Sequence, residues 1–429
     1  MAQKKKKKKK QLQPTRISNL GSNTSLEKAY TAVRKVLQVY GFDLDLLDAF
    51  SKQQRRFLCF LKADPPRFKV EEGNHVPRRL LDFVSESTHR YMRTHYFGDK
   101  KVELTYLELA TYGIAFATTV LTIQEPSGYL PEQMKIIDSL RKCFSENRIV
   151  RDLTEVAIHI RKHMMMVSKM NFRVYGYTWK IGNTLEEGYL KSIVYMSSEE
   201  AKSIYFTYKE KERVAFRVRV GQVITEPPYD AKLDRWFIFQ KEEFPPVYLD
   251  IYIQSHALLR SKERIDIFPA HKRNFYIMEP LLYLHRVVKS PTGSSMLECY
   301  TQEGNTIVRF GYFPFIIQDK KLIVLTFLPL TSPDTYEGDY LQKNLGLQIE
   351  DAKFLGMDKL SFFLTVDFDQ IPILKKALVT TGIWTLIRYA AKVPDVEHAI
   401  DQKKTQMVKK FFEQKIENED ESIYSETEL

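Results

Sequence analysis

The spacing of hydrophobic residues changes near residue 170, and this change constrains the fold more than any other feature of the sequence. Before it, apolar residues recur every three to four positions, as in helices that bury one face. After it, large residues alternate with smaller or polar ones over 173–181, which is typical of a strand. The sequence therefore predicts an α+β protein. An α-helical N-terminal domain is followed by a C-terminal domain with a mainly antiparallel β-meander and flanking helices.

The local patterns also predict where elements and domains lie. We expect helices over 45–61, 77–96, 103–123, 131–147 and 151–170, and strands over 203–208, 213–224, 247–254, 296–301, 306–317 and 321–328. The chain has 429 residues, 44% of them hydrophobic, which is enough for two or three globular domains. The expected organisation is a disordered lysine-rich arm over 1–23, a helical domain over 24–170, an α+β domain over 171–416 and an acidic disordered tail over 417–429.

The arm carries seven consecutive lysines: Lys4, Lys5, Lys6, Lys7, Lys8, Lys9 and Lys10. Such a run does not fold alone, because its charges repel and it has nothing to bury. Its charges are suited to neutralising phosphates, so the run predicts contact with a nucleic acid, RNA rather than DNA. The alternative is a solubilising arm that binds nothing.

The expected location is cytoplasmic, with no membrane partner. The polar stretch after the lysines lacks the apolar core of a secretory signal. The most apolar run, 110–123, is too short to cross a bilayer. The three cysteines are far apart and odd in number, which is typical of reduced thiols. Nothing in the sequence identifies a protein partner.

A basic strand is the first candidate site. In residues 213–220, Val214, Phe216, Val218 and Val220 share one predicted face. The other face carries Arg213, Arg217 and Arg219, with Lys211 leading in. Because residues two apart on a strand lie about 7 Å apart on one face, these cations would lie near the spacing of phosphates along a nucleic-acid strand. The alternative is a half-buried strand whose charged face is simply solvated.

A basic stripe on a helix is the second candidate site. His256, Arg260 and Arg264 are spaced four residues apart, so a helix after the strand 247–254 would place them on one face. A histidine can move a proton, and guanidinium groups stabilise charge that develops on a phosphate. The alternative is an ordinary surface helix.

The sequence predicts a strand, then a helix with the pattern His-Ala…Arg…Arg, then an antiparallel meander whose hairpin has the sequence VRFGYFPFIIQDKKLIVLTFLPL. This order of elements resembles small bacterial toxin ribonucleases of the RelE-type and barnase-like group. The resemblance covers residues 247–340. It implies metal-free cleavage of RNA, with His256 as general acid or base and Arg260 and Arg264 holding phosphate. It also makes Thr326, Thr331 and Glu337 candidates for the same face.

No cofactor or metal is expected. The chain lacks a phosphate-binding glycine loop, a nucleophile elbow and paired CxxC motifs. Glu155, His159 and His163 share a predicted helix, but their side chains diverge too much along a straight helix to bind one ion easily. The sequence thus predicts an intracellular protein that interacts with nucleic acid through a ribonuclease-like domain. The alternatives are a non-catalytic nucleic-acid-binding or regulatory protein of a mobile element, and a protein–protein adaptor.

Overall fold

The structure is a computed structural model that describes residues 23–59, 61–98, 100–123, 128–144, 148–182, 189–220, 229–230, 232–234, 248–283, 285–393 and 399–426. The described residues form two compact units. Unit 1 comprises those of 1–67, 86–156 and 181–193, and unit 2 comprises those of 68–85, 157–180 and 194–429. All but one residue of the predicted N-terminal arm, including its lysines, lie outside the described residues.

Helices dominate the first 170 residues, as the periodicity predicts. The elements are α1 (Asn23–Val39), η1 (Leu44–Ala49), α2 (Lys52–Leu58), α3 (Arg78–Thr94), η2 (Lys100–Val102), α4 (Tyr106–Glu108), the π-helical η3 (Leu109–Gly113), α5 (Ile114–Thr122), α6 (Pro131–Phe144), α7 (Arg148–Asp152) and α8 (Thr154–Val167). In unit 1, α1 packs on η3 and α5 packs on α6. Val36, Phe116 and Phe144 are fully buried there, and the rings of the two phenylalanines meet edge to face at 5.9 Å.

Two short strands also occur before residue 170. They are β1 (Lys62–Ala63) and β2 (Arg67–Val70). Both pair with β4 (Tyr189–Glu200), as does β3 (Arg173–Gly182). β1 runs parallel to the start of β4, with Lys62 opposite Tyr189.

Unit 2 is built on a mainly antiparallel sheet of nine strands. Along its main path the strands follow the order β11–β12–β13–β14–β10–β6–β5, while β15 pairs with β13 and β9 with β10. The strands are β5 (Ser203–Tyr208), β6 (Lys211–Arg217), β9 (Lys232–Asp234), β10 (Tyr248–Gln254), β11 (Val287–Lys289), β12 (Ser295–Glu303), β13 (Thr306–Gln318), β14 (Lys321–Val324) and β15 (Leu328–Pro329). A separate pair joins β7 (Arg219–Val220) to β8 (Tyr229–Asp230).

Strand β10 lies in the middle of this sheet. It pairs in parallel with β14, where Asp250 is opposite Lys321, and antiparallel with β6, where Gln254 is opposite Ala215. Helix α10 (Ser255–Arg264) begins directly after it. The first turn of α10 is therefore placed beside β6.

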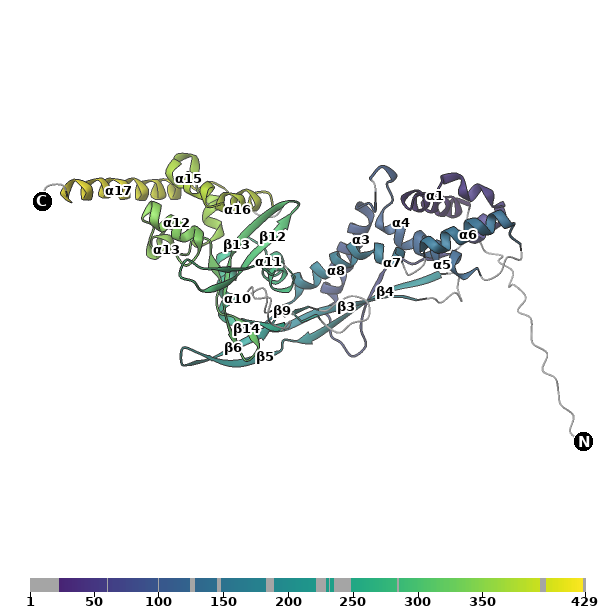
Figure 1. Ribbon diagram of the computed structural model, residues 1–429, viewed down its shortest axis with the longest axis horizontal. Coiled ribbons are helices and arrows are strands. Elements are labelled where there is room, and N and C mark those ends of the chain that lie inside the picture. The colour runs from purple at the N-terminus through teal and green to yellow at the C-terminus, as the bar shows by residue number, and fades with distance from the viewer. Residues whose placement is uncertain are drawn as a thin grey trace, which may run out of the picture. The chain divides into compact units, whose positions relative to one another are not determined.

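Three helices of unit 2 pack on its sheet: α10, α11 (Ala270–Leu282) and α16 (Ile383–Ala390). The other helices of this part of the chain are α12 (Tyr336–Leu345), α13 (Ile349–Leu355), α14 (Leu360–Thr365), η6 (Phe368–Gln370), α15 (Pro372–Thr380) and α17 (Gln402–Glu426). α11 packs on β12, and α16 packs on β13 (Figure 1). Aromatic rings connect the helices to the sheet. The ring centres of Tyr276 on α11 and Phe310 on β13 lie 4.7 Å apart, and the Tyr276 hydroxyl lies 2.8 Å from the Tyr389 hydroxyl on α16.

Two glycines allow close approaches that shape the region after β14. A bulge lies between Cys299 and Tyr300 of β12, opposite Gly311. A Cβ at Gly311 would lie 2.2 Å from the backbone oxygen of Leu328, so only glycine allows β15 to pair there. At the start of α12, a Cβ at Gly338 would lie 1.8 Å from the backbone oxygen of Ser332. These contacts fix residues 328–332.

The predicted α+β fold is confirmed, with helices in the N-terminal region and a mainly antiparallel sheet in the C-terminal part. The chain differs from the prediction at its end, because α17 continues to Glu426 through most of the segment expected to be a disordered tail. Glutamate is a good helix former, which favours this continuation. Within the described part of the chain, no helix is both long and apolar enough to cross a membrane.

Candidate nucleic-acid interface

Helix α10 places the three residues of the predicted basic stripe at different depths. His256, in the first turn, is exposed. The Arg260 side chain is 42% exposed, and that of Arg264, in the last turn, only 14%. The stripe therefore runs from a solvent-facing imidazole to a buried guanidinium group.

His256 lies within the electrostatic reach of two arginines. Partial burial lowers the pKa of its imidazole below the usual value, and the charges of Arg260 and Arg213 lower it further, while Glu263 acts in the opposite direction. Arg213 comes from β6 and Arg260 from α10. The structure thus brings together residues of the basic strand and of the helical stripe, which the sequence predicted as two separate candidate sites. A neutral imidazole between two cations can accept a proton next to a bound anion.

Gln254 adds a buried donor beside these residues. It is the last residue of β10 and the N-cap of α10, and only 2% of it is exposed. Its Oε1 accepts a hydrogen bond from Arg213 at 3.5 Å, while its Nε2 has no hydrogen-bond partner among the described residues. A buried donor without an acceptor costs about 1–3 kcal/mol. Gln254 was not among the predicted site residues, since a glutamine at the end of a strand carries no signal of its own.

The predicted row of cations on one strand is not formed as expected. Val218 separates β6 from β7, so Arg217 and Arg219 belong to different sheets. Arg217 pairs with Asp250 at 2.9 Å, and Arg219 pairs with Glu199. Both acidic partners come from other strands, which the sequence of 211–220 does not reveal.

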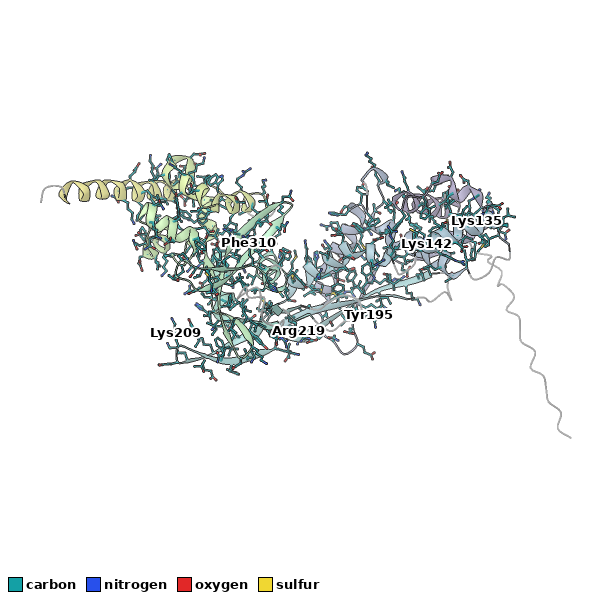
Figure 2. All side chains as sticks on the ribbon, in the orientation of Figure 1. Lys135, Lys142, Tyr195, Lys209, Arg219 and Phe310 are labelled. Carbon is teal, nitrogen blue, oxygen red and sulfur yellow. The ribbon has the colours of Figure 1, made fainter. Side chains whose placement is uncertain are left out.

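The other end of β6 is more accessible. Lys209 and Glu210 have positive φ angles and form the tight turn between β5 and β6, with Lys209 at the tip (Figure 2). Lys211 is exposed just beyond it. This hairpin tip therefore presents two lysines to solvent, alternating with the equally exposed Glu210 and Glu212.

Aromatic rings accompany those cations. The guanidinium of Arg213 lies 5.5 Å from the ring centre of Tyr208, and the ammonium of Lys209 lies 5.6 Å from it. Tyr205 on β5 is 71% exposed. Tyr208 is half-buried and packs against the core with Phe206, so the exposed Tyr205 is the ring suited to stacking with a base.

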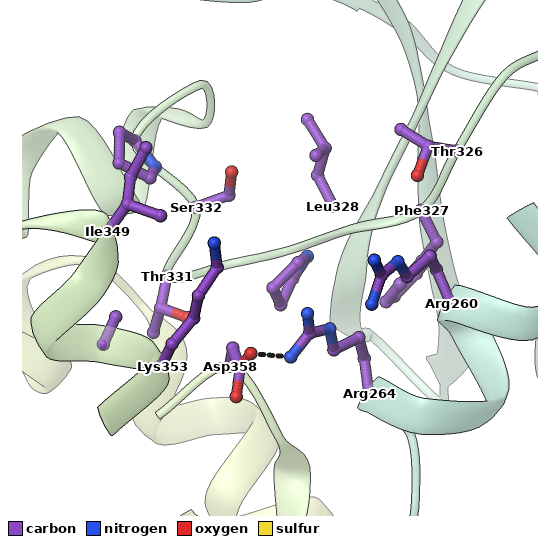
Figure 3. Close-up of a pocket in the computed structure, with 13 residues that line it drawn as sticks. Arg260, Arg264, Thr326, Phe327, Leu328, Thr331, Ser332, Ile349, Lys353 and Asp358 are labelled. Carbon is purple, nitrogen blue, oxygen red and sulfur yellow. Dashed lines mark ion pairs between the residues drawn. The ribbon is translucent and has the colours of Figure 1, made fainter. Parts of the chain in front are cut away.

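The C-terminal part of the stripe, which contains Arg260 and Arg264, faces a pocket with a volume of about 190 Å³. Arg260 and Arg264 project into it from α10, and Lys353 approaches from α13 (Figure 3). Arg264 pairs with Asp358, and Arg260 pairs with Glu263 at 2.8 Å. Thr326 and Thr331, both predicted for this face, also line the pocket, and His256 does not. Sequence analysis missed Lys353 and Asp358, which lie about ninety residues beyond the stripe.

Glu337, the third residue that the resemblance suggested for this face, does not line the pocket. It is buried at the start of α12, where its carboxylate accepts hydrogen bonds from Arg309 at 2.5 Å and from the Tyr312 hydroxyl at 3.0 Å. These bonds satisfy its charge within the fold, so its position is structural.

The histidines of α8 do not form a metal site. His163 is buried, and its Nδ1 lies 2.8 Å from the backbone oxygen of His159. Across the described ranges, no group of three histidine, cysteine, aspartate or glutamate side chains is placed to hold a metal ion.

Comparisons with known proteins gave no match: no family model fits the chain, and neither a curated protein nor a solved structure is significantly similar. The resemblance to toxin ribonucleases therefore stays a prediction that rests on the sequence pattern alone.

Proposed function

We propose that this protein binds RNA at the surface around His256 and cleaves it there without a metal ion. One observation carries the proposal: an exposed imidazole with a lowered pKa lies near Arg213 and Arg260, which come from different elements. A cytoplasmic location is part of the proposal.

His256 acts as the base. In its neutral form the imidazole takes the proton of a ribose 2′-hydroxyl, and the 2′-oxygen then attacks the adjacent phosphorus. The P–O5′ bond breaks, and the 5′-oxygen leaves with a proton from water. The products are a 2′,3′-cyclic phosphate and a 5′-hydroxyl end. DNA is not cleaved, because it lacks the nucleophile.

Arg213 and Arg260 hold the phosphate. The arginines offer charge to the oxygens on which negative charge builds up during attack. Gln254 is too buried to reach the RNA and instead orients Arg213, whose guanidinium donates a hydrogen bond to its Oε1. The exposed end of the β5–β6 hairpin and the lysines of residues 4–10 extend the contact along the RNA by charge and stacking.

The test uses the full-length protein, a single-stranded RNA and a metal chelator. We expect cleavage that generates cyclic phosphate ends, and a loss of about 10²–10⁴-fold in rate for His256→Ala. His75→Ala is the matched control, because His75 is also exposed and lies in the same unit. An RNA with one 2′-deoxy nucleotide at the cleaved position should bind and resist cleavage.

Three results contradict the proposal in different ways. Cleavage that persists in His256→Ala removes His256 from the mechanism. Salt-sensitive binding with no cleavage by any form favours the non-catalytic binding protein. Absence of binding at low salt leaves the protein–protein adaptor.

A further inference from the structure

The pocket at the buried end of α10 has an excess of positive charge. Arg260, Arg264 and Lys353 line it, and Asp358 is the only acidic residue that does so among the described residues. Three cations and one anion give the lining a formal charge of +2. Like charges gathered around a small space repel, so the lining favours an anion between them.

The three cations differ in how firmly they are held. Arg264 and Asp358 are only 14% and 13% exposed, so their ion pair fixes the guanidinium at one side of the pocket. The pair of Arg260 with Glu263 is 42% and 39% exposed, and such surface pairs contribute little free energy. Arg260 can therefore exchange Glu263 for another anion.

Lys353 faces the arginines across the pocket (Figure 3). It is exposed on α13, and no acidic partner for it occurs in the described part of the chain. Its ammonium is thus available to a ligand.

The remaining lining combines hydroxyl groups with apolar walls. Ser332 and Thr326 line the pocket and have no side-chain hydrogen bond among the described residues, while Thr331 donates its hydroxyl proton to the backbone oxygen of Met357 at 2.9 Å. The walls are apolar: Phe327, Leu328, Pro329, Pro333, Ile349 and Ala352. An inorganic anion would satisfy the charges and leave these walls without a partner.

The size of the pocket limits the ligand. A volume of about 190 Å³ equals the share of about six water molecules in the liquid. This is room for a phosphate group and one attached ring, and because the pocket is open to solvent, the rest of a nucleotide would lie at its mouth. The charge of +2 matches a phosphate monoester, which carries nearly two negative charges at neutral pH.

We propose that this pocket binds a nucleoside monophosphate unit, with its phosphate between Arg260 and Lys353 and its ring against the apolar wall. The unit is either a free nucleotide or the 5′-phosphorylated end of an RNA. This site shares Arg260 with the proposed cleavage site but goes beyond it, since Lys353 and Ser332 have no part in proton transfer and His256 does not line the pocket.

The test measures binding of AMP, adenosine and inorganic phosphate to the full-length protein by calorimetry. We expect AMP to bind at least about tenfold more tightly than either fragment, because only AMP engages both the cations and the wall. Lys353→Gln and Ser332→Ala should weaken AMP binding, by about tenfold for the lysine. Lys343→Gln is the matched control: it removes an exposed lysine of α12 that pairs with Asp339 and does not line the pocket.

His256→Ala separates this inference from the proposed function. AMP binding should be unchanged in that variant, so a protein that binds AMP and cleaves nothing supports the pocket and contradicts only the cleavage. Equal affinities for AMP and adenosine, no AMP binding below about 1 mM, or equal AMP affinity in Lys353→Gln and the wild type would overturn the inference. A 5′-phosphorylated dinucleotide that binds more tightly than AMP assigns the pocket to an RNA end, and the reverse order assigns it to a free nucleotide.

Discussion

At the scale of single residues, His256 is controlled by opposing charges. Its partial burial and the neighbouring Arg260 and Arg213 favour the neutral imidazole, whereas Glu263 favours the charged form. Because a cation raises the free energy of a second cation nearby, each arginine should lower the pKa of His256 independently of any catalysis.

This balance gives one prediction about the cleavage rate and one about the pKa of His256 that does not depend on activity. Below its pKa, His256 is protonated and cannot accept a proton, so any cleavage rate should fall about tenfold per pH unit on the acid side of an inflection below pH 6.5. Arg213→Gln removes a positive neighbour and should raise the pKa of His256, while Glu263→Gln removes a negative one and should lower it. Titration of the imidazole proton by NMR measures both shifts. Shifts of the same sign would contradict the described environment.

Residue spacing predicted only those residues of the candidate site that lie close together along the chain. The stripe of His256, Arg260 and Arg264 follows from helix geometry, which depends on near neighbours along the chain. The partners that decide what these residues do come from distant segments. Asp358 neutralises Arg264 from almost a hundred residues away, and Asp250 neutralises Arg217 from a neighbouring strand. No pattern within either segment predicts these pairings.

At the scale of elements, α12 depends on a glycine at its first turn. Thr335 caps the helix by accepting a hydrogen bond from the backbone N–H of Gly338 at 3.1 Å. Gly338 also packs directly on the backbone of Ser332, and Ser332 lines the pocket. The helix and the pocket wall are therefore held by one close backbone contact.

Gly338→Ala should therefore destabilise the protein by about 1–3 kcal/mol, the usual cost of forcing extra atoms into a packed site. The direction of the change in unfolding free energy is informative, because a glycine-to-alanine substitution inside an ordinary helix stabilises the protein by roughly 0.5–1 kcal/mol. Urea unfolding followed by circular dichroism measures the change. An unfolding free energy equal to or above that of the wild type would show that the backbone approach is not as close as described.

The elements themselves were largely predictable. Periodicity gives β5 at its observed bounds and α6 to within three residues at one end. It fails for the two-residue β1, because its pairing partner β4 lies more than a hundred residues away in sequence. It also fails for β4, although β4 pairs with the preceding strand β3. Strand order is also not readable, since the alternation of side chains says which face is buried and not which strand is adjacent.

For the molecule as a whole, the effect of its positive charge on binding can be measured directly. The chain has a net charge of +11, and the lysines of residues 4–10 supply seven of its positive charges. If they contact phosphates, they displace condensed counterions, and binding becomes steeply dependent on salt.

Replacing the seven lysines by glutamines should reduce the slope of log K against log salt concentration by as much as about 5, since each phosphate contact on a single strand contributes roughly 0.7. Fluorescence anisotropy with a labelled RNA at several salt concentrations measures it. The replacement keeps the length of the chain, and His75→Ala serves again as a neutral control. An unchanged slope would assign the run to solubility alone.

The parallel pairing of β10 with β14 has a consequence for synthesis. Asp250 is opposite Lys321, so about seventy residues must emerge after β10 before its partner strand exists. Until then, one edge of β10 has unpaired backbone groups, and such edges recruit other strands. The two arginines of α10, which begins where β10 ends, meet the rest of the pocket that they line only late in translation, because its other residues lie between 326 and 358. A ribosome-bound chain that ends before residue 321 should therefore carry Arg260 and Arg264 without the pocket that they line, and need protection from aggregation.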